Sequence, residues 1–193
     1  MVPLDQLSEV AVLAFDNGLR LHFDSILLYE NGSLPSSVML SVLAMEEFGK
    51  YFSLSAYVFY TETNNNRNKE FEDNFLKALY KHPFKQKVAF GRDGFIASTD
   101  HFSKARDRYY EDLKQRALYV GYERKKGNLL FNKGINKPQQ ITRISAKEQI
   151  SFQNELLIKI LKQHLDGIIE FDEPEVNEIL TSNLLDKLEK TSL

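Results

Sequence analysis

A long, strongly apolar stretch from Ser36 to Tyr60 constrains the fold of this chain more than any other feature. It predicts one long helix, and two carboxylates and a lysine interrupt it in the middle: Glu46, Glu47 and Lys50. A buried helix normally excludes such groups, because an unpaired charge removed from water is very costly. These charges therefore either reach solvent through a narrow window or belong to a functional site.

Length and composition indicate one globular domain that spans residues 1–193. The chain has no cysteine, which excludes disulfides and thiolate metal ligands and fits a reducing compartment. Its first residues lack the basic start and unbroken apolar core of a signal peptide. The charges in the apolar stretch argue against a transmembrane span. We therefore expect a cytoplasmic protein that does not contact a membrane.

The net charge of −2 conceals an uneven distribution. Residues 1–80 have a balance of −6, residues 81–147 one of +10, and residues 148–193 one of −6. One interpretation is that the acidic helices pack against the basic segment. The other is that the basic segment forms a surface for a polyanion, with RNA as the obvious ligand.

Helical periodicity dominates the chain. After the glycine-containing turn at residues 30–35, the apolar helix is expected to start near Pro35. Residues 118–140 differ, because apolar and polar residues alternate around a basic turn, which favours a short hairpin or an extended loop. The prediction is an all-α, HEPN-like helical bundle with this one insertion, the HEPN label depending on the resemblance described below. Helices are expected over residues 5–29, 35–60, 69–80, 83–90, 100–117, 145–169 and 174–190.

Common catalytic motifs are absent, including the glycine-rich phosphate loop, HExxH and Gly-x-Ser-x-Gly. The four histidines are scattered, so no metal site and no cofactor are expected. His22 and His164 lie in amphipathic patterns typical of structural histidines. His82 lies instead among lysines at a helix junction, where neighbouring cations favour a neutral ring and offer binding groups for a phosphate. A surface histidine in a basic turn explains the same pattern.

For Glu46, Glu47 and Lys50, the simplest interpretation is an ordinary ion pair at helical spacing. Such pairs belong on solvated faces, however, and this helix is apolar nearly all round. Gly49 lowers helix propensity and permits a second backbone to approach closely. We therefore favour a charged patch at a contact between helices or subunits.

The run SVLAMEEFGK resembles the Leu-Ala-x-Glu-Glu-x-Gly-Lys signature of the AbiV-type abortive infection proteins, which are bacterial phage-defence proteins of the HEPN superfamily. KHPFKQK resembles that family's His-x-x-Lys element and supplies His82 and Lys85. RALYVGY, followed by a proline and a capped helix from Ser145, completes the order. The resemblance covers about residues 10–165.

The resemblance implies a dimeric, all-α domain that acts as a toxin-like inhibitor during phage infection. Many HEPN proteins are metal-independent ribonucleases in which four to six residues separate an arginine from the catalytic histidine. That pattern is absent here, and Lys77 precedes His82 at the corresponding spacing. Lysine provides charge without the two-pronged phosphate grip of arginine.

If the chain cleaves RNA, we expect the ribose 2′-OH to attack the adjacent phosphate, with His82 as general base or acid. Lys85 and Lys50 would stabilise charge on the phosphoryl oxygens, and Glu47 would orient Lys50 or the histidine. The backbone of the RNA would be held without sequence reading, and an unpaired base would be stacked. The residues expected to bind RNA in this way are Arg116, Tyr119, Arg124, Lys125 and Lys126.

The competing hypothesis is a non-catalytic dimer that blocks translation or binds a phage-encoded protein, which would act as its trigger or activator. A weaker alternative is an adaptor for a separately encoded nucleotidyltransferase. RNA cleavage by the pure homodimer, lost when His82 is changed, distinguishes an enzyme from both.

Overall fold

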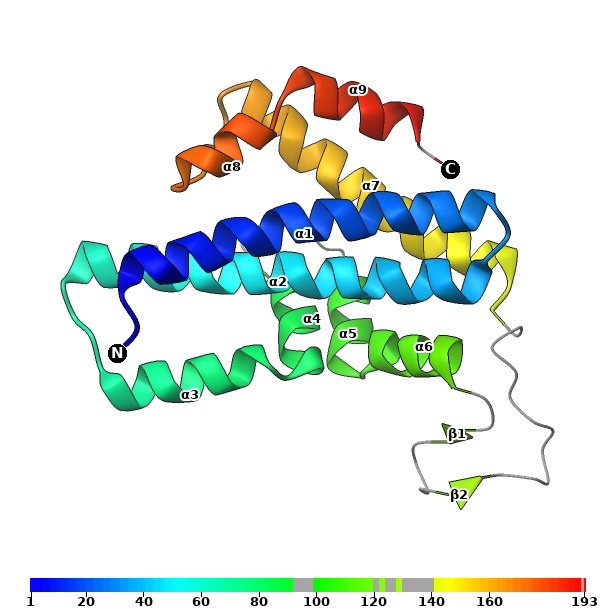
Figure 1. Cartoon of the computed structure of the whole chain (residues 1–193), viewed down its shortest axis with the longest axis horizontal. Coiled ribbons are helices and arrows are strands. Elements are labelled where there is room, and N and C mark those ends of the chain that lie inside the picture. The colour runs from blue at the N-terminus through cyan, green and yellow to red at the C-terminus, as the bar shows by residue number, and fades with distance from the viewer. Residues whose placement is uncertain (92–98, 120–121, 124–127, 130–140, 192) are drawn as a thin grey trace.

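A computed structural model of the chain describes residues 1–91, 99–119, 122–123, 128–129, 141–191 and 193 (Figure 1). The described elements are α1 (Leu4–Glu30), α2 (Leu34–Asn64), α3 (Lys69–Leu79), α4 (His82–Gly91), α5 (Thr99–Arg106), α6 (Tyr109–Leu118), β1 (Tyr122–Glu123), β2 (Asn128–Leu129), α7 (Arg143–Leu165), α8 (Pro174–Ile179) and α9 (Ser182–Lys190).

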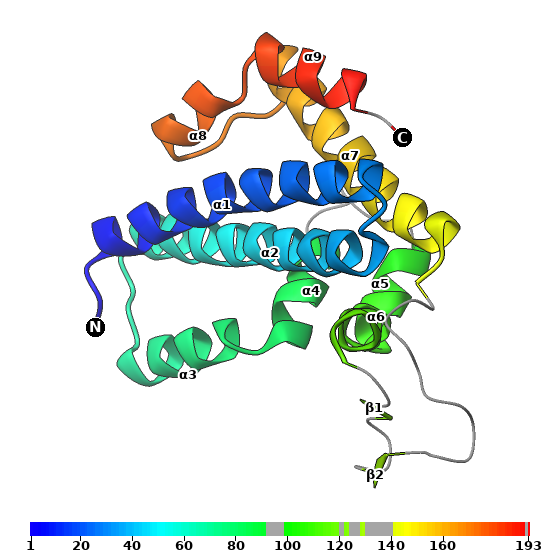
Figure 2. The same cartoon turned by 45° about the vertical axis from the view of Figure 1, so that its right-hand side comes forward.

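The apolar helix predicted from the sequence is α2, and it lies at the centre of the fold. It runs antiparallel to α1, after a turn in which Gly32 has a φ of 78° that favours glycine. Helices α4, α6 and α7 also contact α2. In both views α3 to α6 lie on one side of the α1–α2 pair, while α8 and α9 lie on the other (Figures 1 and 2). Because α2 is surrounded by helices, it can be apolar on nearly every face.

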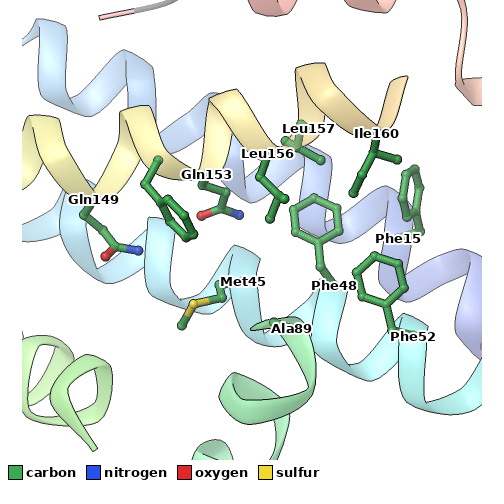
Figure 3. A pocket seen from close by; sticks show the side chains of 11 residues that line it. Phe15, Met45, Phe48, Phe52, Ala89, Gln149, Gln153, Leu156, Leu157 and Ile160 are labelled. Atoms are coloured by element: carbon green, nitrogen blue, oxygen red, sulfur yellow. The ribbon is translucent and has the colours of Figure 1, made fainter. Parts of the chain in front are cut away.

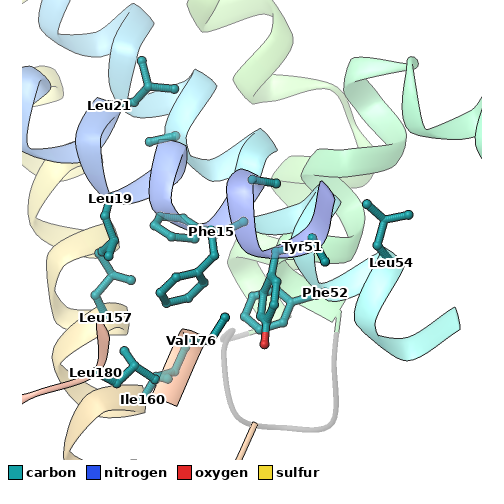
Figure 4. Close-up of a cluster of buried hydrophobic side chains, with 14 of the residues drawn as sticks. Phe15, Leu19, Leu21, Tyr51, Phe52, Leu54, Leu157, Ile160, Val176 and Leu180 are labelled. Atoms are coloured by element: carbon teal, nitrogen blue, oxygen red, sulfur yellow. The ribbon is translucent and has the colours of Figure 1, made fainter. Parts of the chain in front are cut away.

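The largest core cluster joins α1, α2, α7 and the C-terminal helices (Figure 4). Phe15 and Tyr51 are almost completely buried and pack edge to face, with their ring centroids 5.0 Å apart. Val176 of α8 and Leu188 of α9 are buried in the same cluster. Each large apolar side chain removed from water contributes roughly 1.5–3 kcal/mol, so burial of this kind is the main stabilising term.

A small apolar cavity lies between α2 and α7, beside α4 (Figure 3). Its walls include Met45, Phe48 and Phe52 of α2 and Ala89 of α4. The volume is about 20 Å³, which is room for about one water molecule. This cavity is therefore a packing feature and not a ligand site.

The fold prediction is confirmed as an all-α bundle with one short pair of strands. β1 and β2 pair antiparallel, with Tyr122 opposite Leu129 and Glu123 opposite Asn128, inside the predicted insertion. Among the described residues, no helix is both long and apolar enough to cross a membrane.

Several boundaries differ from the sequence prediction. Helix α2 continues past Tyr60 to Asn64, and α7 ends at Leu165 instead of residue 169. The helix expected over residues 100–117 is divided into α5 and α6 because Arg108 adopts a left-handed conformation with a φ of 65°. The helix expected from Ser145 starts earlier, because the Thr142 hydroxyl caps it by accepting a hydrogen bond from the Ser145 backbone at 3.1 Å. The last predicted helix is divided into α8 and α9, and Thr181 caps the second part.

His22 is a buried structural residue. Its Nε2 lies 2.9 Å from Oδ1 of Asn154, and the amide of Asn154 donates to the Leu188 carbonyl at 2.9 Å. This chain of bonds connects α1, α7 and α9. Burial lowers the pKa of His22 to about 4, against the opposing effect of the Asn154 hydrogen bond. The ring is therefore neutral near pH 7.

We expect the free energy of unfolding to fall by roughly 2–3 kcal/mol between pH 7.5 and 4.5 on account of His22. The unfolded histidine binds a proton below about pH 6.5, whereas the folded one does so only near pH 4. The stabilisation is therefore complete above pH 6.5 and is lost as the pH falls toward 4. Urea unfolding measures it, and His22→Gln should flatten the pH dependence. An equally steep dependence in this variant would contradict the assignment.

Candidate functional site

Glu46 forms the centre of a buried polar cluster between α2, α4 and α6. Its side chain is 1% exposed. One carboxylate oxygen lies 2.5 Å from Nδ1 of His82 and 3.5 Å from Nζ of Lys85. The other accepts hydrogen bonds from Gln86 and Lys114, each at 2.9 Å. Two helices, α4 and α6, thus direct polar side chains at one carboxylate of α2, as a buried charge requires.

Gly49 explains how α4 comes so close to α2. A Cβ atom at Gly49 would lie 2.1 Å from the backbone carbonyl oxygen of Lys85, so only glycine permits this approach. Gly49 and Glu46 are three residues apart and share a face of α2. The backbone of α4 therefore rests on Gly49, which brings His82 and Gln86 over Glu46.

We expect Gly49→Ala to lower the free energy of unfolding by about 1–3 kcal/mol, because the methyl group meets a backbone atom that cannot move aside. At an ordinary helix position the same change stabilises. Gly18→Ala is the comparison, since its Cβ would meet a side chain, the ring of Phe48 at 2.8 Å, instead of a backbone atom. Thermal melting of both variants tests this, and a Gly49→Ala protein as stable as wild type would contradict the tight α2–α4 contact.

Lys114 bridges two buried carboxylates. Its Nζ lies 2.9 Å from Glu46 and 3.0 Å from Glu111, its neighbour on α6. Burial raises the pKa of Glu46, but the charge of Lys114 and the hydrogen bonds from His82, Lys114 and Gln86 outweigh it, so the net pKa is lowered. Burial also raises the pKa of Glu111, but hydrogen bonds from Gln115 and Lys114 lower it to about 2. Both carboxylates are therefore ionised at neutral pH.

The geometry around His82 suits proton transfer. An ionised carboxylate only accepts hydrogen bonds, so Nδ1 of His82 carries the proton that faces Glu46. The second ring nitrogen, Nε2, makes no hydrogen bond within the described part of the chain, and the side chain is 47% exposed. A buried carboxylate that fixes one nitrogen of an accessible imidazole is the arrangement used for general acid–base catalysis.

Glu46, His82 and Glu111 also have the composition of a metal site. Their ligand atoms all lie within 4.8 Å of one another. The Lys114 ammonium, however, already lies within hydrogen-bonding distance of both carboxylates. A divalent ion between them would have to displace this buried cation, so Lys114 neutralises the pair.

Two of the four residues predicted to be catalytic lie in this cluster, His82 and Lys85. The other two, Glu47 and Lys50, pair with each other, because Lys50 donates to both Glu47 oxygens at 2.7 Å. Both are partly exposed, and neither contacts His82 in the described structure. Of the two partners expected for Glu47, the structure pairs it with Lys50, and the carboxylate beside His82 is that of Glu46. The narrow solvent window inferred from the sequence thus accounts for Glu47 and Lys50, whereas Glu46 belongs to the buried polar cluster.

Of the residues predicted to bind RNA, two lie at the end of α6. Arg116 and Tyr119 are both exposed there. Arg124, Lys125 and Lys126 lie outside the described residues. The predicted packing of acidic helices against the basic segment is seen at Lys85 and Lys114, both of which face Glu46.

Sequence reasoning missed Lys114, Glu111 and Gln86. One signal was available for Lys114, because it occurs on the apolar stripe of α6. A lysine in the middle of such a stripe predicts a buried partner of opposite charge. The apolar members of the stripe are Tyr110, Leu113 and Ala117.

The sequence model of the AbiV family of HEPN proteins matches residues 6–158. The chain belongs to this family. No curated protein and no solved structure matched the chain. The family match supports an abortive-infection function of the HEPN type, and every residue of the Glu46 cluster lies inside the matched range. Helices α8 and α9 lie beyond it.

Proposed function

We propose that this AbiV-family protein acts in phage defence as a toxin-like, metal-independent endoribonuclease whose proton-transferring group is His82. One observation carries the proposal: Nδ1 of a half-exposed histidine lies 2.5 Å from a buried carboxylate. A purely structural ion pair does not require an accessible second ring nitrogen. Acid–base catalysis does.

In the proposed reaction, Nε2 of His82 removes the proton of a ribose 2′-OH while that oxygen attacks the adjacent phosphorus. The bond from phosphorus to the 5′ oxygen breaks, and that oxygen leaves with a proton supplied by the imidazolium or by water. The products are a 2′,3′-cyclic phosphate and a 5′-hydroxyl end. Glu46 stabilises the positive charge that develops on the ring of His82.

The positive charge for the phosphates comes from the junction of α3 and α4. Lys77, Lys81 and Lys87 are exposed there, on both sides of His82. Lys77 occupies the spacing at which other HEPN proteins have arginine, and its exposed ammonium supports phosphate binding as a point charge. Lys85 is more buried and adds positive charge close to the carboxylate.

Arg116 and Tyr119, with Arg124, Lys125 and Lys126, remain the predicted contacts to the rest of the RNA. Dimerisation through the first two helices likewise remains a prediction, and sedimentation velocity measures it.

A non-catalytic role in binding a phage protein or the translation machinery has one observation in its favour. Glu46 has several partners inside the protein, and a structural network requires such satisfaction too. A single assay distinguishes the two functions.

Purified protein should be incubated with total RNA and with transfer RNA, with and without EDTA. We expect cleavage in both cases, with 2′,3′-cyclic phosphate ends on the products. The His82→Ala variant, purified identically, controls for contaminating nuclease. Cleavage that requires a divalent ion would overturn the proposed mechanism, and intact RNA under all conditions would favour the interaction protein.

A further inference from the structure

A second, open pocket lies between the C-terminal half of α2 and the first half of α3. Its volume is about 540 Å³, within the range of about 300–1,000 Å³ typical of small-molecule sites. None of the residues of the Glu46 cluster lines it. The residues that do are Tyr57, Tyr60, Thr61, Asn66, Asn68, Glu70, Phe71 and Asn74.

The aromatic side of this pocket is firmly supported. Phe71 and Phe75 both stack on Tyr57, at centroid distances of 6.2 and 4.9 Å. The hydroxyl of Tyr57 donates to the buried carboxylate of Glu72 at 2.8 Å, and Arg67 binds the same carboxylate. Phe71 is held by this stack, yet the residue is 61% exposed. Tyr60, also in the lining, is 59% exposed. Such exposed and supported rings are typical of a surface on which another flat ring stacks.

The polar side of the pocket consists mainly of carboxamides. Asn66, Asn68 and Asn74 are all exposed. The Oδ1 atom of Asn68 caps α3 by accepting from the Phe71 backbone at 2.9 Å, and its NH₂ group remains as a donor in the lining of the pocket. Side-chain amides both donate and accept hydrogen bonds, which matches the mixed edge of a nucleobase. An apolar ligand would leave these groups without partners.

Helix α2 contributes to both the pocket and the Glu46 cluster. Tyr57 follows Glu46 by eleven residues on the same helix, which corresponds to roughly 16 Å. Helix α3, whose first half lines the pocket, leads to α4, which starts at His82 (Figure 2). Tyr80, at the end of α3, is 86% exposed, and Lys77 and Lys81 are exposed beside it. Aromatic rings interleaved with lysines are the composition of a track for a single strand.

We propose that this pocket binds one unpaired base of an RNA strand, a few nucleotides away from the phosphate at His82. The base stacks against Phe71 and Tyr60, and its edge bonds to the asparagine amides. The inference rests on the proposed function for its RNA ligand, but it makes a separate statement about binding. It also implies a preference for single-stranded over duplex RNA, since a paired base is not free to enter the pocket.

The chain has no tryptophan, so Phe71→Trp introduces a single fluorescent reporter into the pocket. In a His82→Ala background, which keeps the RNA intact, a single-stranded oligoribonucleotide should change this fluorescence and the same sequence as a duplex should not. Phe59→Trp is the matched control, because Phe59 is 51% exposed on α2 and does not line the pocket. Its fluorescence should stay constant.

Affinity provides the second measurement. Phe71→Ala should weaken binding of the single strand by about 5-fold to 150-fold, and Phe71→Tyr should restore it, because one stacked base is lost and regained. Circular dichroism checks that the variants are folded, and we expect them to be because Phe71 is exposed.

The outcomes separate the two proposals. Binding that depends on Phe71, by a protein that does not cleave RNA, would support the pocket and reject the ribonuclease. If Phe71→Ala cleaved and bound RNA as well as the parent protein, the ribonuclease would be supported and the pocket proposal rejected. A Phe71→Trp signal that is silent to RNA, or that responds only to a protein ligand, would overturn the pocket proposal.

Discussion

Lys114→Met is expected to lower the free energy of unfolding by roughly 3–5 kcal/mol, because it removes the cation from between two buried carboxylates. Glu46 and Glu111 would then face each other with a methionine in place of the ammonium that now contacts both. Methionine retains most of the packing volume, so the loss reports the charge and not a cavity. Urea unfolding at pH 7 measures the change.

Lys50→Met is a matched control. Lys50 also pairs with a glutamate three residues away on its own helix, but that pair is partly exposed. Its loss should cost less than about 1 kcal/mol, because water replaces much of the interaction. If the two variants lost equal stability, burial would not distinguish the two pairs and the central role of Lys114 would be wrong.

The pH dependence of the Lys114→Met variant provides an independent check. In wild type, the pKa of Glu111 is about 2, below its ordinary value of 4.5. A depressed carboxylate pKa gives stability that is present above about pH 4.5 and is lost as the pH falls toward 2. Glu46 contributes with the same sign. Without Lys114, burial should raise both pKa values, so the deficit of the variant should be largest near pH 7 and should shrink below pH 4.5.

The sequence identified the central helix because a small helical bundle can bury so long an apolar run only at its centre. It could not select between Glu46 and Glu47. Adjacent residues are about 100° apart on a helix, and a helix that is apolar nearly all round has no polar face to orient them. The position of Gly49 distinguishes the two glutamates. It shares a face with Glu46 and not with Glu47, so the backbone that approaches glycine must also approach Glu46.

The charge balance of a segment describes its composition, but it does not show which of its lysines are exposed and which are buried. Lys85 and Lys114 raise the positive balance of residues 81–147, yet both point inward to Glu46. The counts therefore overstate the field that an RNA would experience. The break at Arg108 was also unpredictable from propensity, because residues other than glycine rarely adopt the left-handed conformation that Arg108 has.

The second large effect concerns catalysis by His82. We expect His82→Ala to lower RNA cleavage by about 10²–10⁴-fold, the range for removal of a general acid or base. Stability should change little, because the ring is half exposed and Glu46 keeps its bonds from Gln86 and Lys114. Cleavage rates on one defined RNA substrate and melting curves, measured on the same preparations, separate the two quantities.

The neighbouring glutamates provide the sharpest version of this test. Glu46→Gln keeps the size of the side chain but removes the charge that stabilises a protonated His82, so cleavage should fall by about 10²-fold or more. Glu47→Gln makes the same chemical change one residue later, where the partly exposed partner is Lys50. Its cleavage rate should stay within about twofold of wild type, because an exposed pair contributes little. The reverse result, with cleavage lost in Glu47→Gln and retained in Glu46→Gln, would move the catalytic carboxylate to the position that the sequence alone had favoured. The contact between Glu46 and His82 would then be structural.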